Sequence, residues 1–353
     1  MHMADALLSP AVGGAMWAVT AGLTAYSAKK LKESPDDSRV PLMGVLGAFV
    51  FAAQMINFSI PATGSSGHLG GGMILAILLG PHAAFLTLAS VLVVQALFFA
   101  DGGLLALGCN IFNMGFFTCF LAYPFIYKKI AGRFATPRTI FIAATLASLI
   151  GLQLGAFSVV LETVASGISE LPFRTFVLLM QPIHLAIGLV EGVVTAAVVL
   201  FVWQARPEVL AMAAEEAPMR GIPMKKILAG LALAAVVTGG GLSWFASTYP
   251  DGLEWSMAKT SGSEELAAPA SGVHAALAGI QEKTAFLPDY GFRASEAEKP
   301  VGAQAEASGP EEPAVWPNPD MGTSVAGLVG GALTLALAAA IGIFLRRSSV
   351  ARR

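Results

Sequence analysis

"TFVLLMQPIHLAIGLVEGVVTAAVVLFVW" occupies residues 175–203 and contains only two ionisable side chains, His184 and Glu191. A helix needs roughly 20 consecutive apolar residues to cross the hydrocarbon core of a bilayer. That core offers no water to the backbone, so a spanning segment must satisfy its own amide and carbonyl groups. The run therefore predicts a transmembrane helix that carries two polar groups into the membrane.

Similar apolar runs recur along the chain. Of its 353 residues 55% are hydrophobic and 12% are charged, whereas soluble proteins carry about 25% charged residues. The runs are continuous rather than alternating, which favours helices over a β-barrel. We predict an all-α integral membrane protein with further spans at 4–28, 41–60, 69–80, 83–99, 104–126, 139–162, 227–247 and 322–345. The run at 69–80 is short and glycine-rich, so we expect an irregular or partly re-entrant element buried in protein.

Basic residues indicate the orientation of these spans. Sixteen of the 21 Lys and Arg residues fall on one side of the predicted membrane. The excess of Lys and Arg marks the cytoplasmic side, so an odd number of spans places the N-terminus outside and the C-terminus inside. The sixteen are Lys29, Lys30, Lys32, Arg39, Lys128, Lys129, Arg133, Arg138, Arg206, Arg220, Lys225, Lys226, Arg346, Arg347, Arg352 and Arg353.

The chain divides into two parts of different texture. Residues 1–206 hold seven closely spaced spans, 207–224 form a polar cytoplasmic linker, and 225–353 hold two spans as a companion domain. The extracytoplasmic loop 248–320 contains 12 of the 23 acidic residues. Its Pro, Gly, Ser and Glu content predicts that much of it is flexible. Two aromatic stretches, "YPDGLEW" (249–255) and "TAFLPDYGF" (284–292), are expected to be ordered.

Histidine at position 2 suggests a metal site on the outer face. The α-amine of Met1, the amide nitrogen of His2 and the His2 imidazole can bind one metal as three nearly coplanar nitrogens. We expect Met1 to be retained, because the enzyme that removes it disfavours a bulky second residue. His68, within "TGSSGHLGGG" (63–72), is the candidate fourth donor. A square-planar nitrogen set favours Ni(II) or Cu(II) over tetrahedral Zn(II). The alternative for His2 is an ordinary residue of a frayed terminus.

Several polar neighbours are candidates to support the imidazoles. Ser65, Ser66 and Asn57 are expected to form hydrogen bonds around the metal ligands. Gln54 is a further candidate to orient the imidazoles, although such an amide equally serves as an interhelical hydrogen bond. The glycines beside His68 permit close approach of the backbone.

The remaining histidines and both cysteines carry weaker signals. His82 follows Gly80-Pro81 and is interpreted as a structural or capping residue. His184 and Glu191 are seven residues apart on one helix face, which favours either a functional ionisable pair or hydrogen bonds to another helix. His274 has no polar company in the outer loop and is assigned no role. Cys109 and Cys119 are expected to pack as small buried residues.

Motifs of catalysis and of nucleotide binding are absent from the sequence. Nothing in it indicates a nucleic-acid partner, and its surroundings are expected to be membrane lipid. Glu191 and, near an outer edge, Asp101 are the few acidic groups near the spans, which argues against a proton relay. We therefore predict a transport subunit, not an enzyme, that depends on ATP hydrolysis by partner proteins.

Four motifs carry a resemblance: "MHMADALLSPAVGG", "TGSSGHLGGG", "FFADGGLLALGCNIFNMG" and "QPIHLAIGLVEGVVTA". They resemble the nickel and cobalt substrate-binding subunits, NikM and CbiM, of energy-coupling-factor transporters. The second part, with "YPDGLEWSMAK", "TAFLPDYGF" and "GTSVAGLVGGAL", resembles the companion subunit NikN or CbiN, so nearly the whole chain is similar to a NikMN-type fusion.

The resemblance implies a seven-helix bundle that holds the metal through Met1, His2 and His68. It also implies a transmembrane coupling protein of the NikQ or CbiQ type and cytosolic ATPases of the NikO or CbiO type, in the cytoplasmic membrane of a prokaryote. Ni(II) is favoured as the bound substrate, with Co(II) for cobalamin synthesis as the alternative.

Two other functions are less favoured. An intramembrane metalloenzyme would need an open metal position, which a filled planar set of nitrogens does not leave. A passive channel would need polar rings through the membrane, whereas the candidate donors lie only at the predicted outer face.

Overall fold

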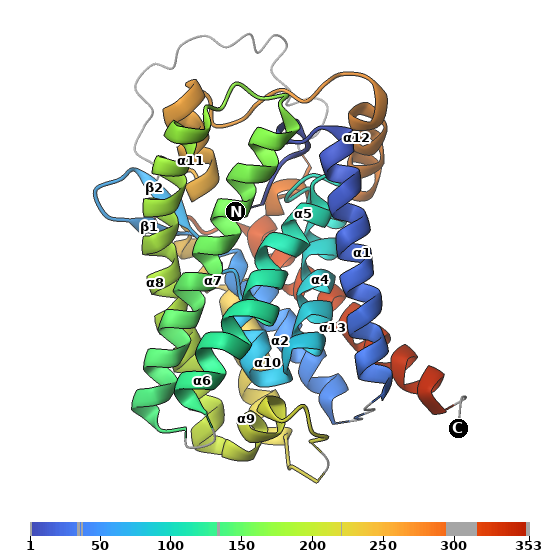
Figure 1. Ribbon diagram of the computed structural model, residues 1–353. Coiled ribbons are helices and arrows are strands. Elements are labelled where there is room, and N and C mark those ends of the chain that lie inside the picture. Colours follow the sequence, from blue (N-terminus) through green and yellow to red (C-terminus); the bar gives the residue numbers. More distant parts are fainter. Residues whose placement is uncertain are drawn as a thin grey trace.

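A computed structural model describes residues 2–33, 36, 38–132, 135–219, 221–293 and 316–350. Its long helices run side by side as a bundle (Figure 1). They are α1 (Pro10–Glu33), α2 (Arg39–Gln54), α4 (Pro81–Phe98), α7 (Pro137–Ser166), α8 (Phe173–Ala205), α10 (Lys225–Gly240), α13 (Met321–Val350) and one helix made of α5 (Leu107–Ile111), the π-helix η2 (Phe112–Tyr127) and α6 (Lys128–Ala131). Helix formation over these apolar runs confirms the predicted all-α class.

Five of the described helices are long and apolar enough to cross a membrane. They are α4, the combined helix Leu107–Ala131, α7, α8 and α13 over Met321–Arg346, whereas α2 is apolar but shorter. The chain is therefore a multi-pass membrane protein by length and composition. The seven-plus-two count of spans and the placement of the termini stay predictions.

Short elements fill the ends of the bundle. They are the helices α3 (Gly72–Leu79), α9 (Pro207–Ala214), α11 (Gly252–Ser261) and α12 (Gly272–Thr284), and the 3-10 turns η1 (Asp5–Leu7), η3 (Leu242–Phe245) and η4 (Pro288–Tyr290). Strands β1 (Phe58–Ile60) and β2 (Ser65–Gly67) form an antiparallel hairpin that pairs Phe58 with Gly67. Every residue of α3 is buried, and its eight residues extend only about 12 Å. The run at 69–80 is therefore an irregular element enclosed by protein, as predicted.

Three predicted span boundaries are wrong for a common reason. The first helix begins at Pro10 rather than near residue 4, the second ends at Gln54, and α10 ends at Gly240. In each case the apolar run continues into irregular chain at the end of the bundle that carries α11 and α12 (Figure 1). Hydropathy counts such apolar residues as helix, because it measures apolar content rather than backbone shape.

The helices α7 and α8 approach closely because small residues face the contact. A Cβ added to Gly192 would lie 2.5 Å from Thr145 Cα, and one added to Gly188 would lie 3.0 Å from Leu149 Cα. Gln153 Nε2 also donates to Gln181 O at 2.9 Å. Small residues let membrane helices pack backbone to backbone, so α7 and α8 form a closely packed helix pair on one side of the bundle.

The two long helices of the second part pack against the first part. A Cβ added to Gly330 of α13 would lie 2.0 Å from the Phe51 ring of α2, and one added to Gly327 would lie 2.4 Å from Gly239 O of α10. Replacing either glycine requires the neighbour to move. The helices α2, α10 and α13 therefore form one packed layer that joins the two parts of the chain.

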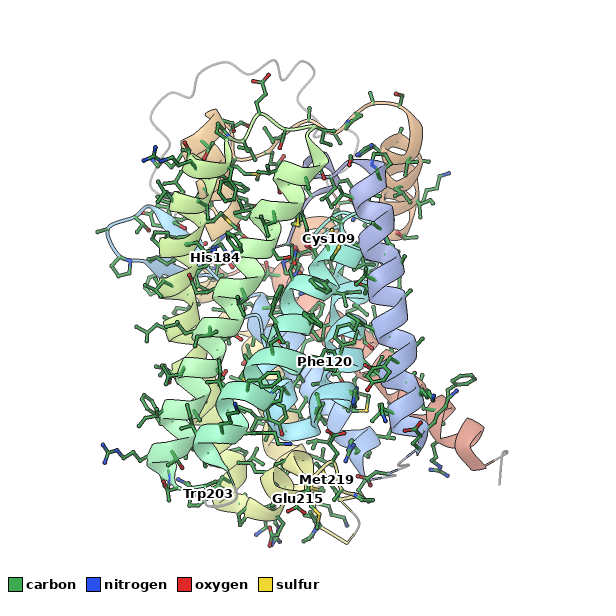
Figure 2. The ribbon with its side chains drawn as sticks, in the orientation of Figure 1. Cys109, Phe120, His184, Trp203, Glu215 and Met219 are labelled. Atoms are coloured by element: carbon green, nitrogen blue, oxygen red, sulfur yellow. The ribbon has the colours of Figure 1, made fainter. Side chains whose placement is uncertain are left out.

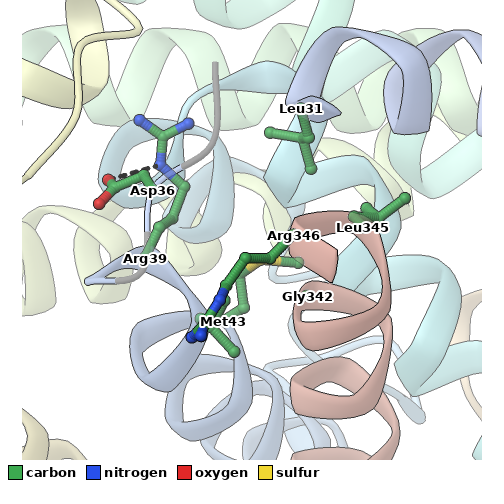
Figure 3. A pocket seen from close by; sticks show the side chains of 8 residues that line it. Leu31, Asp36, Arg39, Met43, Gly342, Leu345 and Arg346 are labelled. Carbon is green, nitrogen blue, oxygen red and sulfur yellow. Dashed lines mark ion pairs between the residues drawn. The ribbon is translucent and has the colours of Figure 1, made fainter. Parts of the chain in front are cut away.

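An ion pair fixes the end of the bundle that lies opposite α11. Asp36 Oδ2 lies 3.6 Å from Arg39 Nε, and Figure 3 shows this pair beside a pocket that α13 also lines. Asp36 Oδ2 accepts the Met219 amide at 2.8 Å, and Arg39 Nη2 donates to Ala217 O at 2.9 Å. Part of the predicted linker 207–224 is thus helix α9, and its later residues are bound to α2.

The outer segment is more ordered than predicted. Residues 252–261 and 272–284 form α11 and α12, and His274 on α12 is buried. His274 Nε2 bonds the Leu8 carbonyl at 2.8 Å, so the prediction that this histidine has no company is wrong. Both islands, 249–255 and 284–292, include ordered elements. Residues 294–315 of the predicted flexible loop lie outside the described residues.

Candidate metal site

The segment that carries His2 is anchored to the loop between α4 and α5. Asn110 Oδ1 accepts the Met3 amide at 2.8 Å, and Asn110 Nδ2 donates to Met3 O at 3.2 Å. The amide of Gly103 also donates to Met3 O at 3.0 Å. Asp5 Oδ1 accepts the Ala106 amide at 3.0 Å. These bonds hold residues 2–5 in a fixed position, with the Met3 side chain buried, rather than as a frayed terminus.

Two polar side chains hold the His2 imidazole. Its Nε2 lies 3.2 Å from Gln95 Oε1, and its Nδ1 lies 3.3 Å from Asp101 Oδ1. Gln95 Nε2 donates to Gln54 Oε1 at 2.9 Å, and Gln54 Nε2 donates to the Gly70 carbonyl at 2.9 Å. A continuous chain of hydrogen bonds therefore joins His2 to the loop that carries His68. Gln54 orients the imidazole through Gln95, not by direct contact.

The structure brings His2 and His68 together. Their ring centroids are 5.0 Å apart and their planes differ by 19°, so the rings are stacked. His68 Nδ1 lies 3.1 Å from Leu69 O. Burial lowers the pKa of His2, and burial lowers the pKa of His68 well below its ordinary value. Both imidazoles are therefore held neutral, which is the form that binds metals.

Glu191 shapes the loop that follows His68. Its two carboxylate oxygens accept the amides of Gly70 at 2.9 Å and Gly71 at 3.2 Å. Gly71 has a φ of +74°, and a Cβ there would lie 2.4 Å from Val50 Cγ1. The suggested pair of Glu191 with His184 is wrong, because the glycine loop occupies the carboxylate. His184 instead bonds Met180 O through Nδ1 at 2.8 Å.

The second part of the chain also reaches this site. Asp251 Oδ2 lies 3.9 Å from His68 Nε2. Asp251 caps α11 by accepting the amides of Leu253 and Glu254, and the Glu254 side chain returns a bond to the Asp251 amide, which completes a capping box. The Ser66 amide donates to Pro250 O at 2.8 Å, and Trp255 Nε1 donates to Thr63 O at 3.0 Å. The hairpin and α11 thus hold each other in place.

A cavity of about 500 Å³, the acidic vestibule, opens above the two histidines. It lies between the segment 2–7, the loop after α4, α11, α12 and η4. Among the described residues that line it there is no Lys or Arg. Its six carboxylates are Asp5, Asp101, Asp251, Glu254, Glu265 and Asp289. Negative charge around a recess raises the local concentration of cations.

The other predicted residues have structural contacts. Ser66 Oγ donates to Tyr249 O at 2.7 Å, Ser65 Oγ donates to Ser66 O at 3.2 Å, and Asn57 lines the vestibule. His82 lies at the opposite end of the bundle, where its Nδ1 is 3.4 Å from Ser27 Oγ. Cys109 and Cys119 are buried free thiols. Met1 lies outside the described residues, and within those residues no three His, Cys, Asp or Glu side chains form a metal cluster.

Sequence reasoning missed Gln95 and Asp251, and it considered Asp101 only as a relay. Gln95 and Asp101 lie 93 and 99 residues from His2 along the chain, and Asp251 lies 183 residues from His68. The one local signal was the "PDGLE" of residues 250–254, in which an Asp precedes a Glu by three positions. This spacing is a capping box and marks the start of a helix.

Comparison with known proteins places the chain in a family. Residues 2–209 match the model of the cobalt uptake substrate-specific transmembrane region, CbiM, and residues 225–347 match the PDGLE domain. A putative fused nickel transport protein NikMN of Archaeoglobus fulgidus is 32% identical over 98% of this chain and 99% of its own. A fused nickel transport protein NikMN of Rhodobacter capsulatus is 33% identical over 82% of this chain and 88% of its own.

A solved structure agrees with these relatives. The crystal structure of a truncated transition metal transporter is 31% identical, with a TM-score of 0.52, and it covers 58% of this chain and 99% of its own. The two relatives are named as nickel transport proteins, and the matching family model is named for cobalt uptake. The chain therefore belongs to the CbiM family of transition metal transport proteins, as a fusion of the CbiM region with a PDGLE domain.

Proposed function

We propose that this protein captures Ni(II) at the outer face of the cytoplasmic membrane and passes it inward. The single observation that carries the proposal is the stacking of His2 and His68 at 5.0 Å between their ring centroids. These two residues are 66 positions apart, and both imidazoles are kept neutral by burial. A metal site accounts for why a chain terminus and a glycine loop are held against each other.

The hydrogen bonds favour one ring nitrogen of His2 as the ligand. Gln95 Oε1 and Asp101 Oδ1 both only accept, the first from Nε2 and the second beside Nδ1. In the metal-bound state His2 Nε2 would donate to Gln95, and the metal would take the place of the Nδ1 proton beside Asp101. Nδ1 is the nitrogen nearer the backbone, so it can close a chelate with the His2 amide nitrogen and the Met1 amine. His68 would complete a square-planar set, which suits Ni(II) and makes Co(II) the second candidate.

Charge and connectivity support the direction of transport. The acidic vestibule gathers cations at one end of the bundle, and the basic residues at the ends of α1, α6 and α13 lie at the other (Figure 1). We therefore assign the vestibule to the outside. The proposed domains are 1–206, which binds the metal, the linker 207–224 and the companion 225–353. A coupling protein of the NikQ or CbiQ type and ATPases of the NikO or CbiO type would supply the energy.

The decisive experiment is insertion of one alanine between Met1 and His2. The insertion moves the amine and enlarges the chelate, so Ni(II) retained after gel filtration should fall to background. Helical content by circular dichroism should be unchanged, and intact-mass analysis of the unaltered protein should show a free amine on Met1. A diamagnetic, square-planar Ni(II) absorption spectrum is expected for the unaltered protein. Undiminished nickel in the insertion variant would refute the proposed ligand set, and preferential retention of cobalt from a mixture would transfer the function to Co(II).

A further inference from the structure

His184 is buried in the membrane region with one ring nitrogen fixed. It is 1% exposed and lies on α8, far from the end of the bundle where Trp203, Glu215 and Met219 are found (Figure 2). Its Nδ1 is 2.8 Å from Met180 O. A carbonyl oxygen only accepts, so Nδ1 carries the proton and Nε2 holds a lone pair. This is the tautomer of a metal-binding histidine whose other nitrogen donates to a backbone carbonyl.

The lone pair of His184 has no hydrogen-bond partner. Nε2 is a buried nitrogen without a partner among the described residues. Buried polar atoms are nearly always satisfied, so an exception calls for a cause. Glu191, on the same face of α8, is committed to the amides of Gly70 and Gly71. A purely structural interhelical bond, the alternative role for this histidine, would need a donor that these surroundings do not provide.

A small cavity joins His184 to the outer site. It measures about 10 Å³ and is bordered by His68, Asp251, Met114 and His184. This is roughly the smallest space that admits one water-sized particle. Gly252 keeps it open, since a Cβ there would lie 3.1 Å from His184 Cε1, the ring atom next to Nε2. The His184 ring and His68 therefore border the same small space.

We propose that His184 Nε2, with the Met114 thioether, forms a transit site for the same divalent transition metal one step inward from His2 and His68. The proposal rests on the proposed function of the outer site. Imidazole and thioether are donors that suit nickel and cobalt, whereas Mg²⁺ and Ca²⁺ require oxygen. Two fixed protein donors bind more weakly than four, and conduction needs an inner site from which the ion can leave.

The first test removes the outer site and asks what remains. Purified full-length His68→Ala protein is titrated with Co(II) and followed by visible absorption. We expect weak residual binding of one Co(II), and adding His184→Gln should weaken it by about tenfold or more. His82→Gln in the same background is the control, because this histidine lies at the opposite end of the bundle and lines neither the vestibule nor the small cavity. Equal residual binding with and without His184 would overturn the transit site.

The second test uses the intact transporter. With His2 and His68 present, His184→Gln should retain the wild-type amount of Ni(II) but lower uptake by about tenfold. Met114→Leu keeps the side-chain volume and removes only the sulfur, so it tests the same site if His184→Gln fails to fold. Wild-type uptake by both variants would reject the proposal. Loss of Ni(II) from the unaltered protein would instead refute the outer site, so the two failures are distinguishable.

Discussion

His68 precedes the glycine loop that leads into α3, and His82 follows Gly80-Pro81 in the first turn of α4, yet their surroundings at the two ends of the bundle differ. His68 is stacked on His2 below a vestibule lined by six carboxylates. His82 contacts the edge of the Tyr26 ring, and Lys30 and Arg39 line the pocket beside it together with Glu33 and Glu216. Each histidine lies near a glycine and a helix start, so what sets them apart is the elements that pack around each ring. A second imidazole, and a vestibule whose described lining holds carboxylates but no Lys or Arg, distinguish the proposed metal site from the surroundings of His82.

The largest expected effect separates these two histidines. His68→Ala should lower Ni(II) affinity by more than the about 10- to 100-fold that loss of a supporting partner costs, because it removes a direct ligand. His82→Ala should change affinity less than about twofold, since nothing joins it to the vestibule. Equilibrium competition with a chelator measures both. Equal losses in the two variants would break the comparison.

The next effect concerns the carboxylate that shapes the His68 loop. Glu191→Gln replaces one accepting oxygen with a donor that opposes an amide of Gly70 or Gly71. The loop should then lose its fixed shape, and Ni(II) affinity should fall about tenfold. Glu162→Gln is the matched control, because Glu162 is a buried carboxylate that bonds Asn113 instead of the loop. A loss of Ni(II) affinity in Glu162→Gln but not in Glu191→Gln would contradict the role of Glu191 in shaping the His68 loop.

A smaller effect tests how much Asp251, from the second part of the chain, contributes to the negative charge of the acidic vestibule. Asp251→Asn keeps an oxygen that can cap α11 but removes the charge near His68. The rate of Ni(II) association at low salt should fall by up to about tenfold, and this loss should shrink as salt rises. Stopped-flow mixing measures the rate. Asp320→Asn is the control, because Asp320 accepts the Thr323 amide at the start of α13, outside the vestibule. Identical rates for all three proteins would show that Asp251 does not attract the ion.

The smallest effect measures how firmly the two parts hold each other at this end. Ser66→Ala removes the bond from Ser66 Oγ to Tyr249 O but keeps the amide bond to Pro250 O. One such hydrogen bond contributes about 1 kcal/mol. Hydrogen exchange in α11 should speed up, while exchange in α7 and α8 stays constant. Faster exchange throughout the bundle would mean that Ser66 stabilises the whole fold instead.

The helices and the pairing of His2 with His68 could be predicted from the sequence, because the physical reasons for them are local. An apolar run of sufficient length must form a helix in a bilayer, and a histidine beside an amine carries its coordination chemistry with it. Three nitrogens at residues 1 and 2 need a fourth donor to complete a planar set, which pairs His2 with His68. The structure places these two rings in contact. Whether they hold a metal stays a prediction.

What could not be predicted depends on contacts across the chain. Gln95 reaches His2 only because α4 lies beside the first residues, and Asp251 reaches His68 only because α11 docks on the hairpin. The spacing of His184 and Glu191 indicated a shared helix face but not the glycine loop that lies against Glu191. The composition of 248–320 suggested flexibility, whereas α11 and α12 are held by bonds to segments far away, such as that from His274 to Leu8.

The packed layer of α2, α10 and α13 has a consequence for assembly. Asp251 and the His68 imidazole that it faces belong to one polypeptide, and this layer packs the two parts that carry them against each other. The encounter between them is therefore intramolecular. A short tether gives an effective concentration on the order of millimolar. Stoichiometry is then fixed at one Asp251 for each pair of His2 and His68, and dilution of the protein in the membrane leaves their contact unaffected.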